Sequence, residues 1–187
     1  MKMFCCAAAL LATLPLRAEV VRLSFEPSRT RVAYTVDSTL HKVNGTFDLK
    51  RGAIEYDTST GKAGGELVID AASGKSGSNG RDGKMHKAVL ESAKYPEIRF
   101  VPDRVEGQVA AGAESEVRLH GQFLLHGATR ELTMAAKVRK TGALLKTSST
   151  FQIPYVQWGL KNPGNFLLKV ADTVEIRIEA EAALAEK

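Results

Sequence analysis

The chain has 187 residues, with 26 Lys and Arg against 21 Asp and Glu, and a formal net charge of +5. This length suits one domain or a small pair, and it is enough to bury a substantial core without disulfides. The positive charge is mild and dispersed rather than gathered along one face, which argues against a nucleic-acid partner.

Residues 1–18 are typical of a secretory signal peptide. Lys2 supplies a positive charge, residues 4–16 are largely apolar, and Ala18 is a small residue at the end of the segment. The apolar run is too short to cross a membrane as a helix. We therefore expect an exported protein, periplasmic or secreted after cleavage near Ala18, with a mature domain of residues 19–187.

The two cysteines, Cys5 and Cys6, both lie inside this segment. The mature chain therefore has no thiol, no disulfide and no cysteine-based metal or nucleophile site. Removal of Lys2 and Arg17 leaves 24 basic and 21 acidic residues, a net charge of +3.

After the signal segment, apolar and polar residues alternate with period two, which predicts short strands with one buried face. Turn signals such as Glu26-Pro27, Arg51-Gly52 and Gly61-Lys62 separate the runs. The apolar positions of this first half are Val21, Leu23, Phe25, Val32, Tyr34, Val36, Val43, Phe47, Leu49, Ile54, Tyr56, Leu67 and Ile69.

One segment departs from this period. Met85, Val89 and Ala93 recur four residues apart, and Leu90 widens the stripe, so the spacing predicts an amphipathic helix over residues 82–94. A Gly/Ser/Lys stretch over residues 73–83 is expected to be a flexible approach to the helix. A proline at 96 then ends the helix, because the residue before a proline is pushed out of the α region.

Period two returns at residue 97 and marks the later strands, with a polar loop at residues 161–165 before the last one. No internal repeat or domain linker interrupts it, and the spacing of the turns leaves no room for parallel crossovers. An antiparallel sheet built from hairpins is therefore expected. Its later apolar positions are Ile98, Phe100, Val117, Leu119, Phe123, Leu125, Leu132, Met134, Ala136, Val138, Val174, Ile176 and Ile178.

About eight strands with one apolar face must close as a barrel or fold over as a sandwich. A transmembrane barrel has the same alternation with apolar residues outside. Against it, the polar face of the last strand carries Glu175, Arg177, Glu179 and Glu181, and the aromatic residues sit in the middle of strands rather than in girdles. We therefore expect a soluble barrel that does not span a membrane.

Five segments in this order resemble the YceI-like family of exported lipocalin-like barrels that bind polyisoprenoids or related lipids. Together they cover essentially the whole mature chain. They are residues 41–47 (HKVNGTF), 65–73 (GELVIDAAS), 81–100 with its YPEIRF end, 120–129 (HGQFLLHGAT), and 158–160 with 168–176. The resemblance implies an all-β, antiparallel, up-and-down, eight-stranded barrel with one or two short helices, and a helix flanking or closing it.

The family resemblance also implies lipid binding inside the barrel, and the residue types agree. Flat apolar side chains make good walls for an isoprenoid chain, and Gly45 and Gly121 leave side-chain space on the inward face. The alternative is that the aromatic residues fill the interior and leave no cavity. The predicted ligand-binding residues are Tyr34, Phe47, Phe100, Phe123 and Phe151, with Trp158 and Phe166 near a strand end.

The histidines do not predict a metal site. His120 and His126 lie on one strand about 20 Å apart at the usual rise, so they cannot share an ion, and His41 suits a surface or capping role. Asp82 and His86, four apart on the helix, form the one tempting catalytic pair. No activated nucleophile accompanies them, and Asp82 suits the start of a helix. No catalytic residue, metal or cofactor is therefore predicted.

The sequence thus predicts a non-enzymatic carrier or reservoir that holds a polyisoprenoid, prenyl quinone or other long apolar lipid. Two alternatives remain at this stage: an enzyme acting on a hydrophobic substrate through His41 or the Asp82/His86 pair, and a solid-cored interaction module. A homodimer is possible through an exposed sheet edge.

Overall fold

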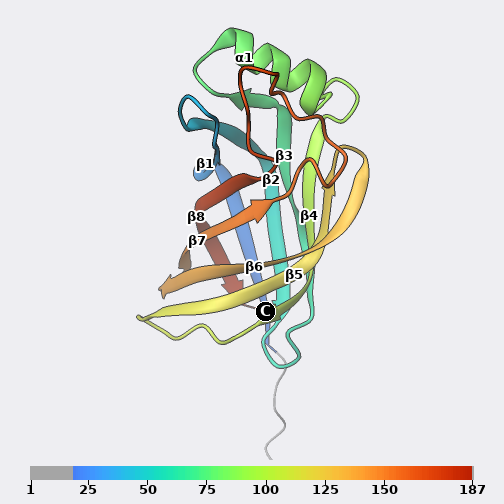
Figure 1. Cartoon of the computed structure of the whole chain (residues 1–187). Coiled ribbons are helices and arrows are strands. Elements are labelled where there is room, and N and C mark those ends of the chain that lie inside the picture. Colours follow the sequence, from blue (N-terminus) through green and yellow to red (C-terminus); the bar gives the residue numbers. More distant parts are fainter. Residues whose placement is uncertain (1–18, 187) are drawn as a thin grey trace, which may run out of the picture.

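A computed structural model describes residues 19–186, so the predicted signal peptide lies outside the described residues. Eight strands form one closed antiparallel barrel, each pairing with its neighbours in sequence and β1 with β8 (Figure 1). The bounds are β1 Val20–Val36, β2 Val43–Asp57, β3 Ala63–Lys75, β4 Glu97–Glu106, β5 Glu114–Leu125, β6 Ala128–Thr141, β7 Leu144–Ile153 and β8 Val174–Glu186. The predicted barrel and its strand order are confirmed, and the sandwich alternative is wrong.

The alternating apolar and polar residues of each strand form the inner and outer faces of the barrel wall. On β6, Met134, Ala136 and Val138 are buried inside, whereas Lys137 and Arg139 are exposed outside. The same pattern on neighbouring strands builds two layers of interior side chains, one around Val21, Leu23, Ile54, Val117 and Leu145, and another around Leu125 and Ile153. Tyr155 and Leu160, from the loop between β7 and β8, pack into the second layer.

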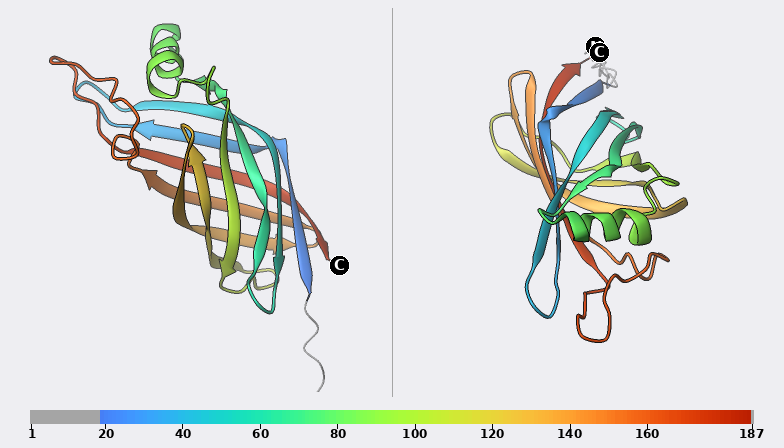
Figure 2. Two further views of the ribbon diagram at one scale, coloured as in Figure 1. Left: turned by 90° about the vertical axis from the view of Figure 1, so that its right-hand side faces the viewer. Right: turned by 90° about the horizontal axis from the view of Figure 1, so that it is seen from above.

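The connections divide between the two ends of the barrel. The links after β1, β3, β5 and β7 lie at one end, together with the helix, while both ends of the described chain lie at the other (Figures 1 and 2). We refer to the first as the helix end. No helix within residues 19–186 is long and apolar enough to cross a membrane.

The helix runs over α1 (Asn79–Lys84) and η1 (Met85–Val89), and not over residues 82–94 as predicted. It starts where the Asp82 N–H donates to the Ser78 carbonyl over 2.9 Å. It ends in a wide turn in which the Leu90 N–H reaches the Met85 carbonyl at 2.8 Å, and Glu91 then adopts a positive φ of 46°. The predicted flexible stretch is also wrong in part, because β3 continues to Lys75.

A charge cluster on the outer wall ties β2 to β4 across β3. The Glu97 side chain is 15% exposed and accepts hydrogen bonds from Lys50 over 2.9 Å, from Arg51 over 3.3 Å and from Arg99. The Lys50 ammonium and the Arg99 guanidinium, with Arg51, lower the pKa of Glu97 to about 2. Glu97 is therefore ionised at any pH at which the barrel is ordinarily studied.

Candidate functional site

The barrel interior holds two apolar cavities. The larger has a volume of about 500 Å³ and lies at the helix end, between the barrel wall, the helix and the connecting loops. The smaller, of about 110 Å³, lies deeper in the barrel. An open interior of this size contradicts the solid-cored alternative, because a water molecule takes only about 30 Å³ of liquid volume.

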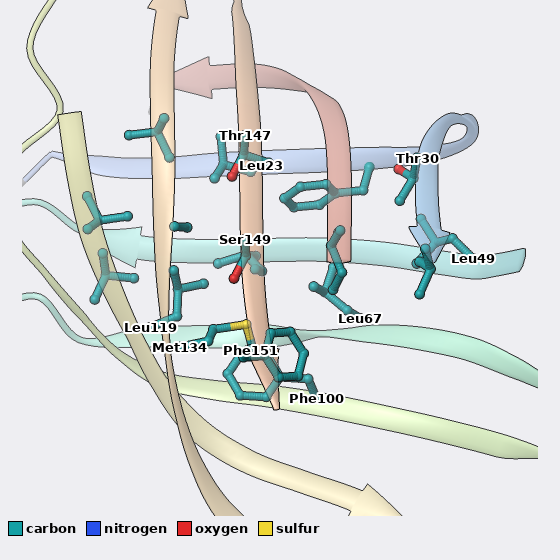
Figure 3. A pocket seen from close by; sticks show the side chains of 18 of the residues that line it. Leu23, Thr30, Leu49, Leu67, Phe100, Leu119, Met134, Thr147, Ser149 and Phe151 are labelled. Carbon is teal, nitrogen blue, oxygen red and sulfur yellow. The ribbon is translucent and has the colours of Figure 1, made fainter. Parts of the chain in front are cut away.

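The two cavities adjoin one another. Six residues line both: Val32, Ile69, Ile98, Phe123, Phe151 and Ile178. Side chains from several strands converge on the deep cavity, where Phe100, Met134 and Phe151 lie together (Figure 3). The rings of Phe123 and Phe151 therefore stand at the boundary between the two cavities.

Polar groups also line the deep cavity: Arg99 and the hydroxyl groups of residues that include Thr30, Thr147 and Ser149 (Figure 3). The Ser149 hydroxyl donates to the Ala135 carbonyl over 2.6 Å, so its donor is used within the wall. The Thr30 hydroxyl is buried and has no hydrogen-bond partner among the described residues. A buried polar group without a partner is costly, so the wall of the deep cavity is not uniformly apolar.

Five of the seven predicted ligand-binding residues line this interior. Tyr34, Phe47, Phe123 and Phe151 line the large cavity, and Phe100 lines the deep one. Their contact with a ligand stays a prediction.

The other two predicted residues lie elsewhere. Trp158 lines neither cavity, but its ring packs 5.8 Å from the Phe123 ring, with the Arg130 guanidinium 5.1 Å from the Trp158 ring. Phe166 is 97% exposed, so its predicted inward position is wrong. The reason is that it lies in the loop between β7 and β8, where strand alternation does not apply.

Two tyrosines contribute hydroxyl groups near the large cavity without adding charge. The Tyr34 hydroxyl donates to the Met85 sulfur over 3.6 Å, and the Tyr155 hydroxyl to the Ala171 carbonyl over 2.8 Å. Burial raises the pKa of Tyr34, and nearby Asp82 adds to the rise. Burial and Asp172 raise the pKa of Tyr155 to about 12. Both phenols therefore remain neutral.

The helix covers the large cavity. Three residues of the predicted apolar stripe line this cavity: Met85, Val89 and Leu90. The fourth, Ala93, is exposed because the helix has already ended. The Lys84 ammonium donates to the Pro163 carbonyl in the loop between β7 and β8. This bond holds the helix to the facing side of the cavity mouth.

The family of the chain follows from a match over most of its length. The sequence pattern of the YceI-like domain matches residues 23–182. The chain belongs to the YceI-like family. No match was found among curated proteins.

Solved structures share the fold of this YceI-like barrel at low sequence identity. BcnA of Burkholderia cenocepacia superposes with a TM-score of 0.67 and 18% identity over 85% of this chain and 99% of that one. A polyisoprenoid-binding domain from Saccharophagus degradans, implicated in plant cell wall breakdown, gives 0.67 and 17% over 87% and 97%. The Campylobacter jejuni YCEI protein gives 0.61 and 17% over 78% and 85%.

Two glycines of the YceI-like barrel were expected to open the interior, and neither does. A Cβ atom at Gly45 would lie 2.3 Å from the Tyr34 ring, so that ring already fills the space. A Cβ atom at Gly121 would lie 2.3 Å from the Val101 carbonyl oxygen, so this glycine permits close packing of two strands.

The Asp82/His86 pair is not assembled in the YceI-like barrel. Asp82 accepts hydrogen bonds from the backbone N–H and the hydroxyl of Ser76, which fix the start of the helix. His86 instead contacts the Gly74 carbonyl at 2.9 Å and the Ser92 hydroxyl at 3.3 Å. Within residues 19–186, no group of three His, Cys, Asp or Glu side chains could hold a metal ion.

Sequence reasoning missed most of the cavity wall. The aliphatic residues shared by both cavities gave no signal beyond ordinary alternation, since they look like any core positions. The loop residues Leu40, His41, Pro163, Leu168 and Val170 also line the large cavity. They belong to no periodic segment. The family resemblance covered His41 through residues 41–47 and Leu168 and Val170 through residues 168–176, but not Leu40 or Pro163.

Proposed function

We propose that this protein is a non-enzymatic carrier or reservoir that holds one long apolar chain of the polyisoprenoid class inside its barrel. The observation that carries the proposal is the pair of adjoining apolar cavities, of about 500 and 110 Å³, within a closed barrel. The polyisoprenoid-binding domain of Saccharophagus degradans, which shares the fold, supports the class of ligand.

The volume sets the length of chain that fits. At ~30 Å³ per non-hydrogen atom, similar to the share of a water molecule in the liquid, the large cavity holds about 17 atoms and the deep cavity about four. Twenty carbons correspond to about four isoprene units. A longer polyisoprenoid must leave its remaining units outside the mouth.

Burial of such a chain is sufficient for useful affinity. Twenty apolar carbons at ~0.8 kcal/mol each gain about 16 kcal/mol gross, from which association costs of ~4–15 kcal/mol are subtracted. Rigid barrel walls keep the cost toward the lower end of this range, since few side chains need to be ordered on binding. We propose that the chain enters tail first, with its polar end among His41, Arg81 and Lys84 at the mouth.

Native mass spectrometry of delipidated protein tests this function. Polyisoprenoid alcohols of two to eight units are offered one at a time, and we expect one molecule per protein, held most tightly at four units. Protein that takes up no member of this series would refute the proposal.

A matched pair of variants separates the cavity from the outer wall. Ile176 lines the large cavity, whereas Val101 is 42% exposed on the outside. Ile176→Trp is expected to reduce uptake at least tenfold because the indole occupies ligand space, and Val101→Trp is expected to leave it unchanged. Circular dichroism is the control that both variants fold.

We further propose that the protein works in the periplasm after export, with residues 1–18 as its signal peptide. The charged start and apolar run of this segment support the proposal. Cell fractionation of the full chain and of a chain starting at Glu19 provides the test. Both chains in the cytoplasmic fraction would refute it.

A further inference from the structure

Two loops at the helix end form a single projecting lip, which we define as residues 37–42 and 161–173. They are paired through backbone hydrogen bonds, from the Thr39 N–H to the Lys169 carbonyl over 3.0 Å and from the Ala171 N–H to the Asp37 carbonyl over 2.8 Å. The loops extend beyond the strands, beside one another (Figure 2). The lip is therefore one structural unit although its parts come from opposite ends of the sequence.

The lip carries the three most exposed large apolar side chains of residues 19–186. Leu40, Phe166 and Leu167 are 76%, 97% and 86% exposed, against 42% or less for the next residues of this kind. Isolated exposed apolar residues are ordinary, but a group of large ones at one tip marks an interaction site.

The tip is held in place by hydrogen bonds rather than being a loose loop. The Asn165 side-chain carbonyl accepts the N–H groups of Leu167 and Leu168 over 2.9 and 2.8 Å, and the Asn165 N–H donates to the Leu168 carbonyl over 2.8 Å. This closed turn displays Phe166 and Leu167 at its outer edge. Their exposure is therefore built into the backbone of the lip.

The lip carries a small excess of positive charge, with Lys42, Lys161 and Lys169 against Asp37 and Asp172. Asp37 lies 3.6 Å from the Lys42 ammonium, whereas Asp172 accepts from the neutral Asn162 amide over 2.7 Å and keeps its charge. Lys161 and Lys169 are exposed and form no ion pair within the described residues. The lip therefore presents two lysines outside any ion pair beside three apolar side chains, and its formal charge is +1.

The geometry points to docking of this lip on the surface of an anionic lipid bilayer. Phe166, Leu167 and Leu40 would enter the boundary between headgroups and acyl chains, and the two lysines would contact lipid phosphates. Apolar side chains combined with basic residues bind such surfaces through buried area and electrostatic attraction together. A protein partner fits less well, since a stable protein interface covers about 800 Å² on each side and three side chains at a tip offer far less.

Docking in this orientation places the cavity mouth against the membrane. Leu40, Leu168 and Val170 belong to the lip and also line the large cavity. An apolar chain could then pass between bilayer and barrel along lip side chains without crossing bulk water. Docking itself does not require an occupied cavity, so it can be tested apart from the proposed function.

The test is cosedimentation of the protein with vesicles that contain no polyisoprenoid. Vesicles of phosphatidylglycerol and phosphatidylethanolamine are compared with vesicles of phosphatidylcholine alone, at 50 mM and 500 mM salt. We expect binding to the anionic vesicles that weakens at least tenfold at high salt, because screening shortens the reach of the lysines.

Four variants locate the binding surface. The double variants Phe166→Ser/Leu167→Ser and Lys161→Glu/Lys169→Glu are each expected to weaken binding to anionic vesicles at least tenfold. Controls at the opposite end of the barrel are Leu144→Ser, an exposed apolar residue, and Lys62→Glu, an exposed lysine without an ion pair among the described residues. We expect both controls to bind as the wild type does.

The outcomes are decisive because all substituted side chains are exposed, so each variant is expected to fold. Absence of wild-type binding to anionic vesicles overturns the inference, as does wild-type binding by either lip double variant. Binding lost equally in the controls also overturns it, since the surface would then lie elsewhere.

Discussion

Phe123 lies at the junction between the two cavities. Its replacement by alanine should lower the stability of the barrel and lengthen the ligand that it prefers. Its ring borders both cavities on one side and packs 5.8 Å from the Trp158 ring on the other. Phe123→Ala therefore removes part of the interior wall without altering the mouth.

The size of the effect follows from the six ring carbons that are lost. Truncation of a buried Phe costs ~3–5 kcal/mol, and we expect the lower value, about 3 kcal/mol, because this ring already faces empty space. For a domain of this size the Tm should fall by about 6–12 °C at ~2–4 °C per kcal/mol. The vacated volume admits about six more ligand atoms at ~30 Å³ each, so the preferred polyisoprenoid lengthens from four to five units.

Thermal unfolding by circular dichroism and native mass spectrometry with the polyisoprenoid series measure the two effects. Phe166→Ala is the matched control, the same change on an exposed loop, and should alter Tm by less than 2 °C and leave the preferred length at four. Phe123→Leu, a milder truncation, replaces the alanine variant in both measurements if that variant is too unstable to study. A folded Phe123 variant that still prefers four units would refute the role of this ring at the junction.

Three further changes test the wall, the mouth and the outer charge cluster. Glu97→Gln should lower Tm at pH 7. The pKa of Glu97 is lowered from 4.5 to about 2, so the stabilisation of the barrel by the ionised Glu97 is complete above pH 4.5 and is lost as the pH falls toward 2. The Tm values of variant and wild type should therefore converge there, and a constant gap would contradict this. Lys84→Met removes the bond between the helix and the facing loop, so bound ligand should dissociate about fivefold faster in stopped-flow fluorescence, a loss of ~1 kcal/mol. An unchanged rate would show that this bond does not help to retain the ligand. Gly45→Ala places a Cβ atom 2.3 Å from the Tyr34 ring and should destabilise the barrel to chemical denaturation by more than about 2 kcal/mol, whereas Gly64→Ala, which meets open space, should stay within about 0.5 kcal/mol.

The barrel was largely predictable because each strand carries its own signal. Alternation fixes which side chains face inward along a strand, and short turns fix antiparallel pairing. Alternation does not decide between a barrel and a sandwich, since both hide one apolar face. The family resemblance supplied that choice, and the pairing of β1 with β8 confirms it.

The helix shows where periodic reasoning fails. Its apolar stripe was correct for Met85, Val89 and Leu90, but its ends were set by backbone hydrogen bonds that periodicity does not encode. Ser76 and Ser78 anchor its start, and the left-handed conformation of Glu91 follows its end. A non-glycine residue with positive φ is uncommon, so the sequence offered no reason to expect the break there.

The candidate site was predictable only where it lies on strands. Tyr34, Phe47 and Phe151 face the interior because alternation places them there. Phe166 lies in a loop, where a side chain's direction depends on hydrogen bonds such as those of Asn165. Cavity volume depends on how all these side chains pack together, and no local pattern reports it.

Pairing of β1 with β8, which closes the barrel, is also expected to be a late step in folding. Every other strand pair is formed by neighbours in the sequence, but Tyr34 pairs with Ile176, across nearly the whole described chain. Contacts at such separation form slowly because a long loop must close first. Until the final strand docks, β1 and β7 are both unpaired edges, and a shortened chain that lacks β8 would keep them open to intermolecular pairing. The last strand therefore protects the protein against aggregation as much as it completes the wall.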